Sequence, residues 1–292
     1  MKRHVLAAVL LAAAATPAAA YTSYLKPDQF WVTEAEVEVE GSYATSFFTP
    51  AIAVGGGLTV LNPAGERVRA DRIAVTPGGA TELQADLSRG GTYRVSTGEV
   101  MGQVANLVGG ADGQWRVLGE GETPPPDAPT TTLQTITVAD TYVTRGTASD
   151  VSQMPTVGRL AIRPITHPNQ VLAAQGFQIE LLFDDQPLGN VAIVLYSEGD
   201  PETKLDRYVA TDANGRATFT FDGPGRYIIA ARHRTDMPAG SAAAVGSYTT
   251  TLTFEALNQL HAETEVQEAT AEPERPSRSR QPARRRVGRP DH

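Results

Sequence analysis

Apolar and polar residues alternate in short stretches along most of the chain. The stretch 31–41, WVTEAEVEVEG, places Val37 and Val39 on one side and Glu36 and Glu38 on the other. A period of two residues is that of a β-strand, because successive side chains point to opposite faces of a sheet. The pattern predicts a half-buried strand whose outer face is acidic and solvated.

Similar stretches recur at short intervals between turns rich in Gly and Pro, and no convincing amphipathic helix occurs before residue 255. Short strands at this spacing are typical of β-sandwiches. We therefore expect an all-β fold with two β-sandwich domains, Ig-like or transthyretin-like. The expected order is a signal peptide over 1–20, an N-terminal β-sandwich over 21–120, a Pro/Thr-rich linker with connecting strands over 121–175, a C-terminal transthyretin-like β-sandwich over 176–256, and a disordered tail, acidic and then Arg-rich, over 257–292.

The segment 211–233, TDANGRATFTFDGPGRYIIAARH, shows the pattern most clearly. Gly215 closes a turn, since glycine accepts a positive φ without steric cost. Phe219 and Phe221 alternate with threonine, and Tyr227 begins the next strand after Gly-Pro-Gly. We expect a strand pair whose aromatic side chains face a core.

The N-terminus has the composition of a secretory signal. Lys2 and Arg3 precede the apolar run 5–15, and three alanines end at residue 20. A positive start, a short apolar region and small residues at the cleavage site define such a signal, although a retained anchor is the alternative. We expect cleavage before Tyr21, a periplasmic location and no membrane span in the mature protein.

Composition excludes several classes of function. The chain has no cysteine, which rules out disulfides, thiolate catalysis and cysteine-bound zinc. Its formal net charge is −8, although seven arginines follow residue 274. An acidic body is a poor partner for nucleic acid, whereas the basic tail suits an anionic surface.

Histidines are the main candidates for chemistry. His167 lies in a Thr-His-Pro-Asn turn, and His233 lies between two arginines at the end of a predicted strand. They are not at a metal-ligand spacing in the sequence, so the fold would have to bring them together, and a structural role for each stays open. The chain has no Gly-x-Ser-x-Gly motif, and we expect no enzyme.

Four motifs together resemble a known family. They are Tyr-Leu-Lys-Pro at 24–27, Val-Thr-Arg-Gly at 143–146, Pro-Ile-Thr-His-Pro-Asn at 164–169 and the strand pair at 211–227. This combination is similar to a bacterial periplasmic domain-of-unknown-function family associated with cobalt and nickel uptake. The C-terminal unit also resembles transthyretin-like and carboxypeptidase-regulatory domains.

The resemblance implies an exported, non-catalytic, all-β accessory protein with nickel or cobalt as its ligand. Members of the family typically begin the mature chain with a histidine, whereas this chain has Tyr21 there. A phenol is protonated at neutral pH and is a poor ligand. A metal site would then depend on His167 and His233, with Asp212 as a carboxylate ligand.

Two functional hypotheses follow from these observations. The first is a periplasmic binding or accessory protein of an envelope uptake system, whose partner is a transporter or an outer-membrane receptor. The second is a non-catalytic structural or protein-interaction module that its basic tail tethers to the cell envelope.

Overall fold

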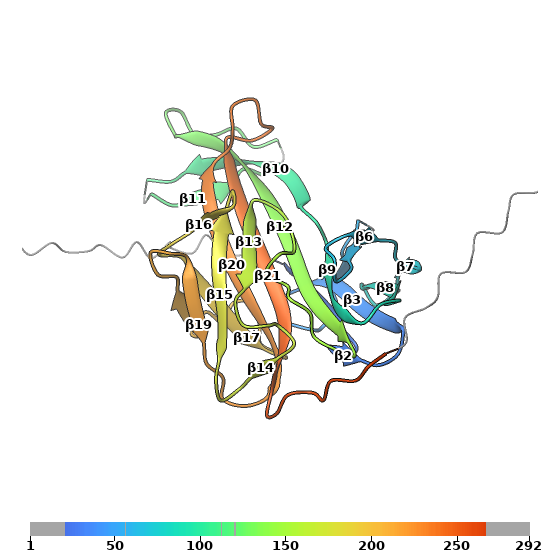
Figure 1. Ribbon diagram of the computed structural model, residues 1–292. Helices are drawn as coiled ribbons and strands as arrows, with labels where there is room; N and C mark the ends of the chain where they lie inside the picture. The colour runs from blue at the N-terminus through green and yellow to red at the C-terminus, as the bar shows by residue number, and fades with distance from the viewer. Residues whose placement is uncertain (1–20, 56, 112, 120, 267–292) are drawn as a thin grey trace, which may run out of the picture.

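The computed structural model describes residues 21–55, 57–111, 113–119 and 121–266 (Figure 1). Every regular element in this part of the chain is a β-strand, which confirms the all-β fold. No helix long and apolar enough to cross a membrane occurs among these residues. The expected signal peptide (1–20) and the Arg-rich part of the expected tail lie outside the described residues.

The strands form three sheets, named here the N-terminal, large and C-terminal sheets. The N-terminal sheet contains β1 (Thr22–Pro27), β3 (Glu36–Ala44), β4 (Ile52–Ala53), β7 (Arg72–Val75) and β8 (Thr81–Asp86). The C-terminal sheet contains β13 (Leu160–Pro164), β15 (Phe177–Phe183), β16 (Gln186–Pro187) and β19 (Arg216–Phe219). The large sheet contains β2 (Trp31–Val32), β5 (Thr59–Leu61), β6 (Arg67–Val68), β9 (Gly91–Ser96), β10 (Val100–Gly109), β11 (Trp115–Val117), β12 (Thr130–Arg145), β14 (Val171–Leu172), β17 (Ala192–Ser197), β18 (Tyr208–Ala210), β20 (Gly225–Asp236) and β21 (Val245–Leu257).

Strand β12 joins the two halves of the chain within the large sheet. It pairs in parallel with β21 over residues 133–141. Along its other edge it pairs antiparallel first with β10 and then with β9. The segment 121–175, which we expected to be a linker with connecting strands, therefore contains the strand that unites strands from both predicted units in one sheet.

The side chains of β12 alternate between two hydrophobic cores. Ala139 and Val143 face the N-terminal core, between the N-terminal sheet and strands β5, β9 and β12. Ile136 and Tyr142 face the C-terminal core, between the C-terminal sheet and the opposite side of the large sheet. Successive side chains of a strand point to opposite faces. One strand can therefore contribute to both cores only when the side chains on each face are apolar or have their charges and polar groups paired.

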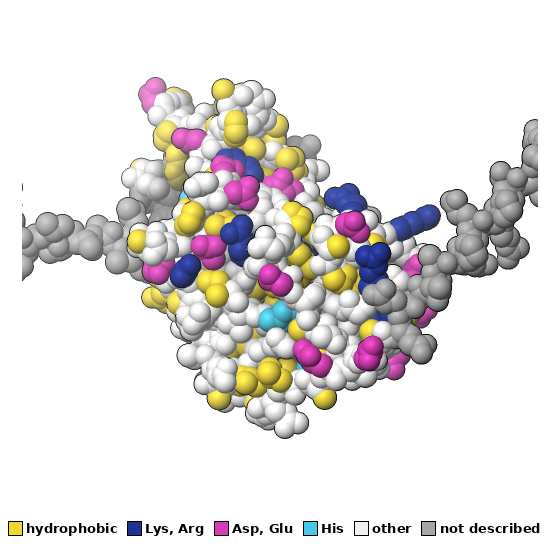
Figure 2. Space-filling view, viewed as in Figure 1, with side chains coloured by type: hydrophobic (Ala, Val, Ile, Leu, Met, Phe, Trp, Pro, Cys, Tyr) yellow, Lys and Arg dark blue, Asp and Glu magenta, His cyan; other side chains and the backbone are white. Residues whose placement is uncertain are grey.

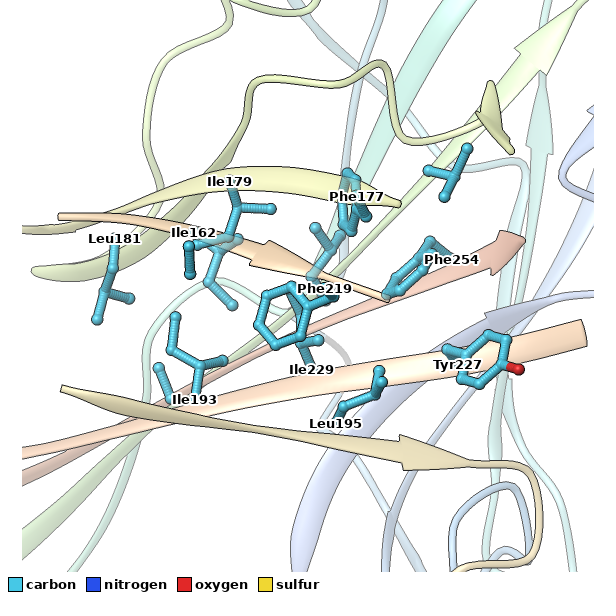
Figure 3. Close-up of a cluster of buried hydrophobic side chains, with 14 of the residues drawn as sticks. Ile162, Phe177, Ile179, Leu181, Ile193, Leu195, Phe219, Tyr227, Ile229 and Phe254 are labelled. Carbon is cyan, nitrogen blue, oxygen red and sulfur yellow. The ribbon is translucent and has the colours of Figure 1, made fainter. Parts of the chain in front are cut away.

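The C-terminal core confirms the expected direction of the aromatic residues at 219 and 227. Phe219 is fully buried and Tyr227 is almost fully buried. Figure 3 shows β15 contributing Phe177 and Ile179 to the same cluster as Ile229 of β20. The alternation of β3 is also confirmed, since Val37 and Val39 are buried whereas Glu36 and Glu38 are exposed.

A third cluster fastens the N-terminal strand to the back of β17 and β20. Tyr24 of β1 and Phe47 after β3 pack in one group with Tyr196 and Ile228. The rings of Phe47 and Tyr196 have centroids 4.6 Å apart. Beside them the Tyr196 hydroxyl donates to the Glu202 carbonyl at 2.9 Å. The first strand of the described chain is thus held by residues of the C-terminal half.

The part of the expected tail that is described follows the surface of the N-terminal half. The ring of His261 stacks on Trp31 with centroids 5.2 Å apart. The N–H of Thr264 donates to the carbonyl of Gly146 at 3.0 Å. Gly146 has φ of 70°, and an added Cβ would lie 2.5 Å from the Thr264 carbonyl oxygen, so this approach requires glycine.

One ion pair is buried within the large sheet. The guanidinium of Arg94 on β9 bonds to the carboxylate of Asp140 on β12, and both side chains are only 3% exposed. Arg94 Nη1 also donates to the Pro155 carbonyl at 2.9 Å. A buried charge without its partner pays a large desolvation penalty, so each member of the pair depends on the other.

We expect Asp140→Leu to reduce the free energy of unfolding by about 3–5 kcal/mol, because Arg94 would stay buried without a counter-charge. The double variant Arg94→Met/Asp140→Leu should recover most of that loss. Urea unfolding of the wild type, both single variants and the double variant measures this difference. Equal stability of Asp140→Leu and the double variant would contradict the coupling.

Candidate functional site in the arm of the large sheet

His167 lies between β13 and β14, and both of its ring nitrogens have hydrogen-bond partners. Nδ1 accepts from the N–H of Asn169 at 3.2 Å, and Nε2 lies 2.9 Å from the Thr92 hydroxyl. Burial lowers the pKa of His167, and a hydrogen bond to the Ser149 backbone and the nearby Asp150 carboxylate oppose this only in part. The ring is therefore a neutral link between the loop and β9.

His233 is on β20, on the face that meets the C-terminal sheet. Its ring packs edge-on against Phe183 with centroids 4.8 Å apart. Burial lowers the pKa of His233, and the positive charge of Arg159 lowers it further. Arg159 itself bonds to both carboxylate oxygens of Asp184 at 2.6 Å. An arginine beside the ring disfavours a bound cation.

Asp212 caps the turn before β19. Its Oδ1 accepts from the N–H of Asn214 at 2.8 Å and from the N–H of Arg216 at 2.9 Å. This is the local side-chain-to-backbone bonding that makes aspartate common in turns. The turn that we predicted at this position is confirmed.

The structure does not bring these three residues together. His233 pairs with Tyr248 of β21, which in turn pairs with Ile136 of β12. His167 contacts Thr92 of β9, which pairs with Thr144 near the other end of β12. Eight residues of strand separate these two positions on β12, or about 26 Å.

Asp212 follows β18, which is five strands from β9 in the large sheet, or about 24 Å. Among the described residues no group of three His, Asp or Glu side chains is placed to hold a metal ion. A single site built from His167, His233 and Asp212 is thus excluded by the distances between their strands.

The large sheet extends beyond both cores as an arm, at the top of Figure 1. We define the arm as β10, β11, residues 130–137 of β12, and the stretches that continue the sheet from there, residues 245–249 of β21 and 232–236 of β20. Strand β10 pairs with β11 on one side and with residues 130–137 of β12 on the other. Ala244, just before β21, bonds through its N–H to the Thr132 hydroxyl at 2.8 Å.

One face of the arm holds a hollow of about 1010 Å³. Residues 103–106 of β10 and 130–132 of β12 form its floor, and Leu118, Gly119, Gly121, Glu122 and Pro124 form one wall. The wall is fixed by Glu122, whose carboxylate bonds to the Arg116 guanidinium and accepts from the N–H of Gly119 at 2.9 Å. The lining is mixed, with threonine hydroxyls, amides and short apolar groups.

The arm also exposes large apolar side chains on both faces. On the face with the hollow, Met101 is 62% exposed and Val104 is 40% exposed. On the back face, Trp115 is 37% exposed and Val117 is 55% exposed. Figure 2 shows hydrophobic atoms at the surface over this end of the molecule. Clustered apolar exposure marks interaction sites more often than isolated exposed residues do.

The sequence at 115–117 has the pattern of a strand, but the pattern does not show the role of that strand. Trp115 and Val117 alternate with Arg116, which predicts one buried face, whereas all three residues are exposed. The signal that separates an arm from a core strand is the absence of an opposing sheet, and a single strand's pattern does not contain it.

Comparison with known proteins identifies the family of the chain. Residues 18–235 match the model of the DUF4198 family, a domain of unknown function, and the chain belongs to this family. This confirms the resemblance to a family of unknown function. The match assigns neither metal uptake nor a transthyretin-like unit, so both stay hypotheses.

Other comparisons add little. No curated protein matches the chain. The solved D0–D1 domain of intimin is 13% identical and is matched over 79% of this chain and 96% of the intimin chain. The TM-score of this match is 0.20, which is too low for any argument about fold or function.

We expect nickel and cobalt titrations to give the same calorimetric trace for the wild type, His167→Gln and His233→Gln. The positions on β12 that are level with His233 and with the contact of His167 are about 26 Å apart, so the two rings cannot share an ion whose bonds to nitrogen are near 2 Å. Saturable heat in the wild type that both variants lose would contradict the arrangement.

We also expect stability to fall as the pH drops from about 7.5 to about 5.5. The pKa of His167 and that of His233 are lowered in the folded state. The unfolded chain therefore binds protons first, from its usual histidine pKa near 6.5 downward, and folding loses free energy in that window. Urea midpoints across this range measure the slope, which should be smaller in His167→Gln. A slope of opposite sign would contradict the burial of both rings.

Proposed function

We propose that the chain is an exported, non-catalytic protein-interaction module of the cell envelope, and that the arm is its docking element. The observation that carries the proposal is the extension of the large sheet beyond both cores, with large apolar side chains exposed on each face. Such a surface costs free energy in water and is relieved by a partner.

The arm also has the mixed chemistry of a non-obligate interface. Trp115 and Val117 supply an apolar centre, and Trp is among the residues enriched at binding hot spots. Arg116 and Glu122 neutralise one another at the rim. The hollow beside them offers backbone and hydroxyl groups to a polypeptide. These features favour a protein partner over a metal ion or a charged polymer.

The expected signal peptide supports a periplasmic location for this activity. A transporter or an outer-membrane receptor is the kind of partner that such a location offers, and the Arg-rich end of the chain suits attachment to an anionic surface. Nickel or cobalt as a ligand has no support from His167, His233 and Asp212, because the fold places His167 far along the large sheet from the strands that hold the other two.

Site-specific photocrosslinking in intact cells tests the proposal. We expect a crosslinking amino acid at Val104 or Val117 to give one discrete adduct with an envelope protein. Val75 on β7 is the matched control, because it is also a strand valine and is 67% exposed. The adduct at Val104 should disappear when Val117→Asp is added, since a charge beside the exposed Trp115 opposes docking. The same adducts at Val75, or none at the arm, would refute the proposal.

A further inference from the structure

Strand β11 is an edge of the arm, and the direction of its backbone groups follows from its register. The N–H of Gly110 donates to the Gln114 carbonyl, and the N–H of Leu118 donates to the Asn106 carbonyl. In an antiparallel pair, hydrogen-bonded positions alternate with positions whose N–H and C=O groups point outward. The outward positions on β11 are Trp115 and Val117, which lie opposite Gly109 and Leu107. Of their outward groups, the Val117 carbonyl accepts a long hydrogen bond of 3.4 Å from Arg116 Nη1.

The same two residues place their side chains on one face. Leu107 and Thr131 are level with Val117 across β10 and β12, and cross-strand partners share a face. Trp115 and Val117 therefore combine outward backbone groups with exposed apolar side chains at alternate positions. An extended polypeptide that adds to a sheet edge uses both features: hydrogen bonds supply affinity and alternate side chains supply specificity.

We propose that β11 binds an extended segment of a partner protein as an added antiparallel strand, with apolar side chains opposite Trp115 and Val117. This inference rests on the proposed function and names the kind of partner that the arm accepts. The segment carries no basic residue opposite Arg116, because the only acid bonded to that guanidinium among the described residues, Glu122, already belongs to this chain.

The chain's own C-terminal end does not fit this edge. The described chain ends at Val266, which packs against Gly146 and Gly90. Gly146 follows the end of β12 opposite to the arm, about 16 residues or roughly 50 Å of strand from Thr130, so only residues after about 281 are far enough along the chain to reach β11. The residues that follow are rich in Arg and Pro, and proline cannot donate to a ladder.

A second copy of the chain does not fit either. In the register that overlaps most of β11 with itself, Trp115 lies opposite Val117 of the other copy and Arg116 lies opposite its own counterpart. Glu122 of each copy is already bonded to its own Arg116, so neither copy supplies a carboxylate to the other, and two guanidinium groups directly opposite each other are unfavourable.

Capped heptapeptides that alternate valine and threonine test the inference on the full mature chain. With Trp31→Phe, Trp115 is the single tryptophan, and its fluorescence reports binding at β11. We expect saturable binding by the unmodified peptide. Valines on the face of Trp115 point their N–H groups at β11, so N-methylation of the valines should weaken binding at least about tenfold, whereas N-methylation of the threonines should leave it unchanged.

A matched pair of protein variants completes the test. Val117→Pro removes an outward N–H and leaves the hydrogen bonds to β10, so it should also weaken peptide binding at least about tenfold. Val75→Pro is the control and makes the same change on β7, which is also an edge strand. Thr76 and Ala80 form the neighbouring hydrogen-bonded pair, so the N–H of Val75 points outward as that of Val117 does. This variant should change peptide binding less than about twofold.

Equal binding of the two methylated peptides, unchanged binding by Val117→Pro, or no saturable response up to about 1 mM peptide would overturn strand addition. Those results would leave the crosslinks at Val104 and Val117 intact if the arm docks a partner by another surface. Absence of the crosslinks, in contrast, refutes the docking function itself, so the two failures are distinguishable.

Discussion

The structure depends on β12, whose successive side chains enter two different hydrophobic cores. Its residues face the N-terminal core at Ala139 and Val143 and the C-terminal core at Ile136 and Tyr142. Both faces of this strand are therefore buried, and the charged residue among these positions, Asp140, is buried only because Arg94 neutralises it. One strand thereby makes the two halves of the chain a single sheet.

A sheet shared by two offset cores is longer than either of them, and the arm is the consequence. Where the opposing sheets end, β10, β11 and the first residues of β12 continue without an apolar layer to cover Trp115 or Val117. Exposed edges are usually protected in soluble proteins. The two cores thus hold the arm in place although its exposed apolar side chains are unfavourable in water. A partner that covers them would remove this cost, which connects the fold to the proposed function.

The sequence predicted local structure well and the assembly poorly, for a physical reason. The alternation at Val37 and Val39 and the turn at Asp212 depend on neighbours in the chain, so the pattern was sufficient. The pairing of β12 with β21 joins residues more than 100 positions apart, and no local pattern specifies it. The histidines failed as a metal site for the same reason: their separation is set by the register of distant strands.

Native-state hydrogen exchange on Val143→Ala tests the shared role of β12 most directly, because Val143 contributes to the N-terminal core alone. If β12 makes the halves one cooperative unit, the amides of Ile179 and Leu181 in β15 should lose the same free energy of protection as those of Val39 and Leu83. Loss of protection in the N-terminal sheet with β15 unchanged would show two independent domains and contradict the account.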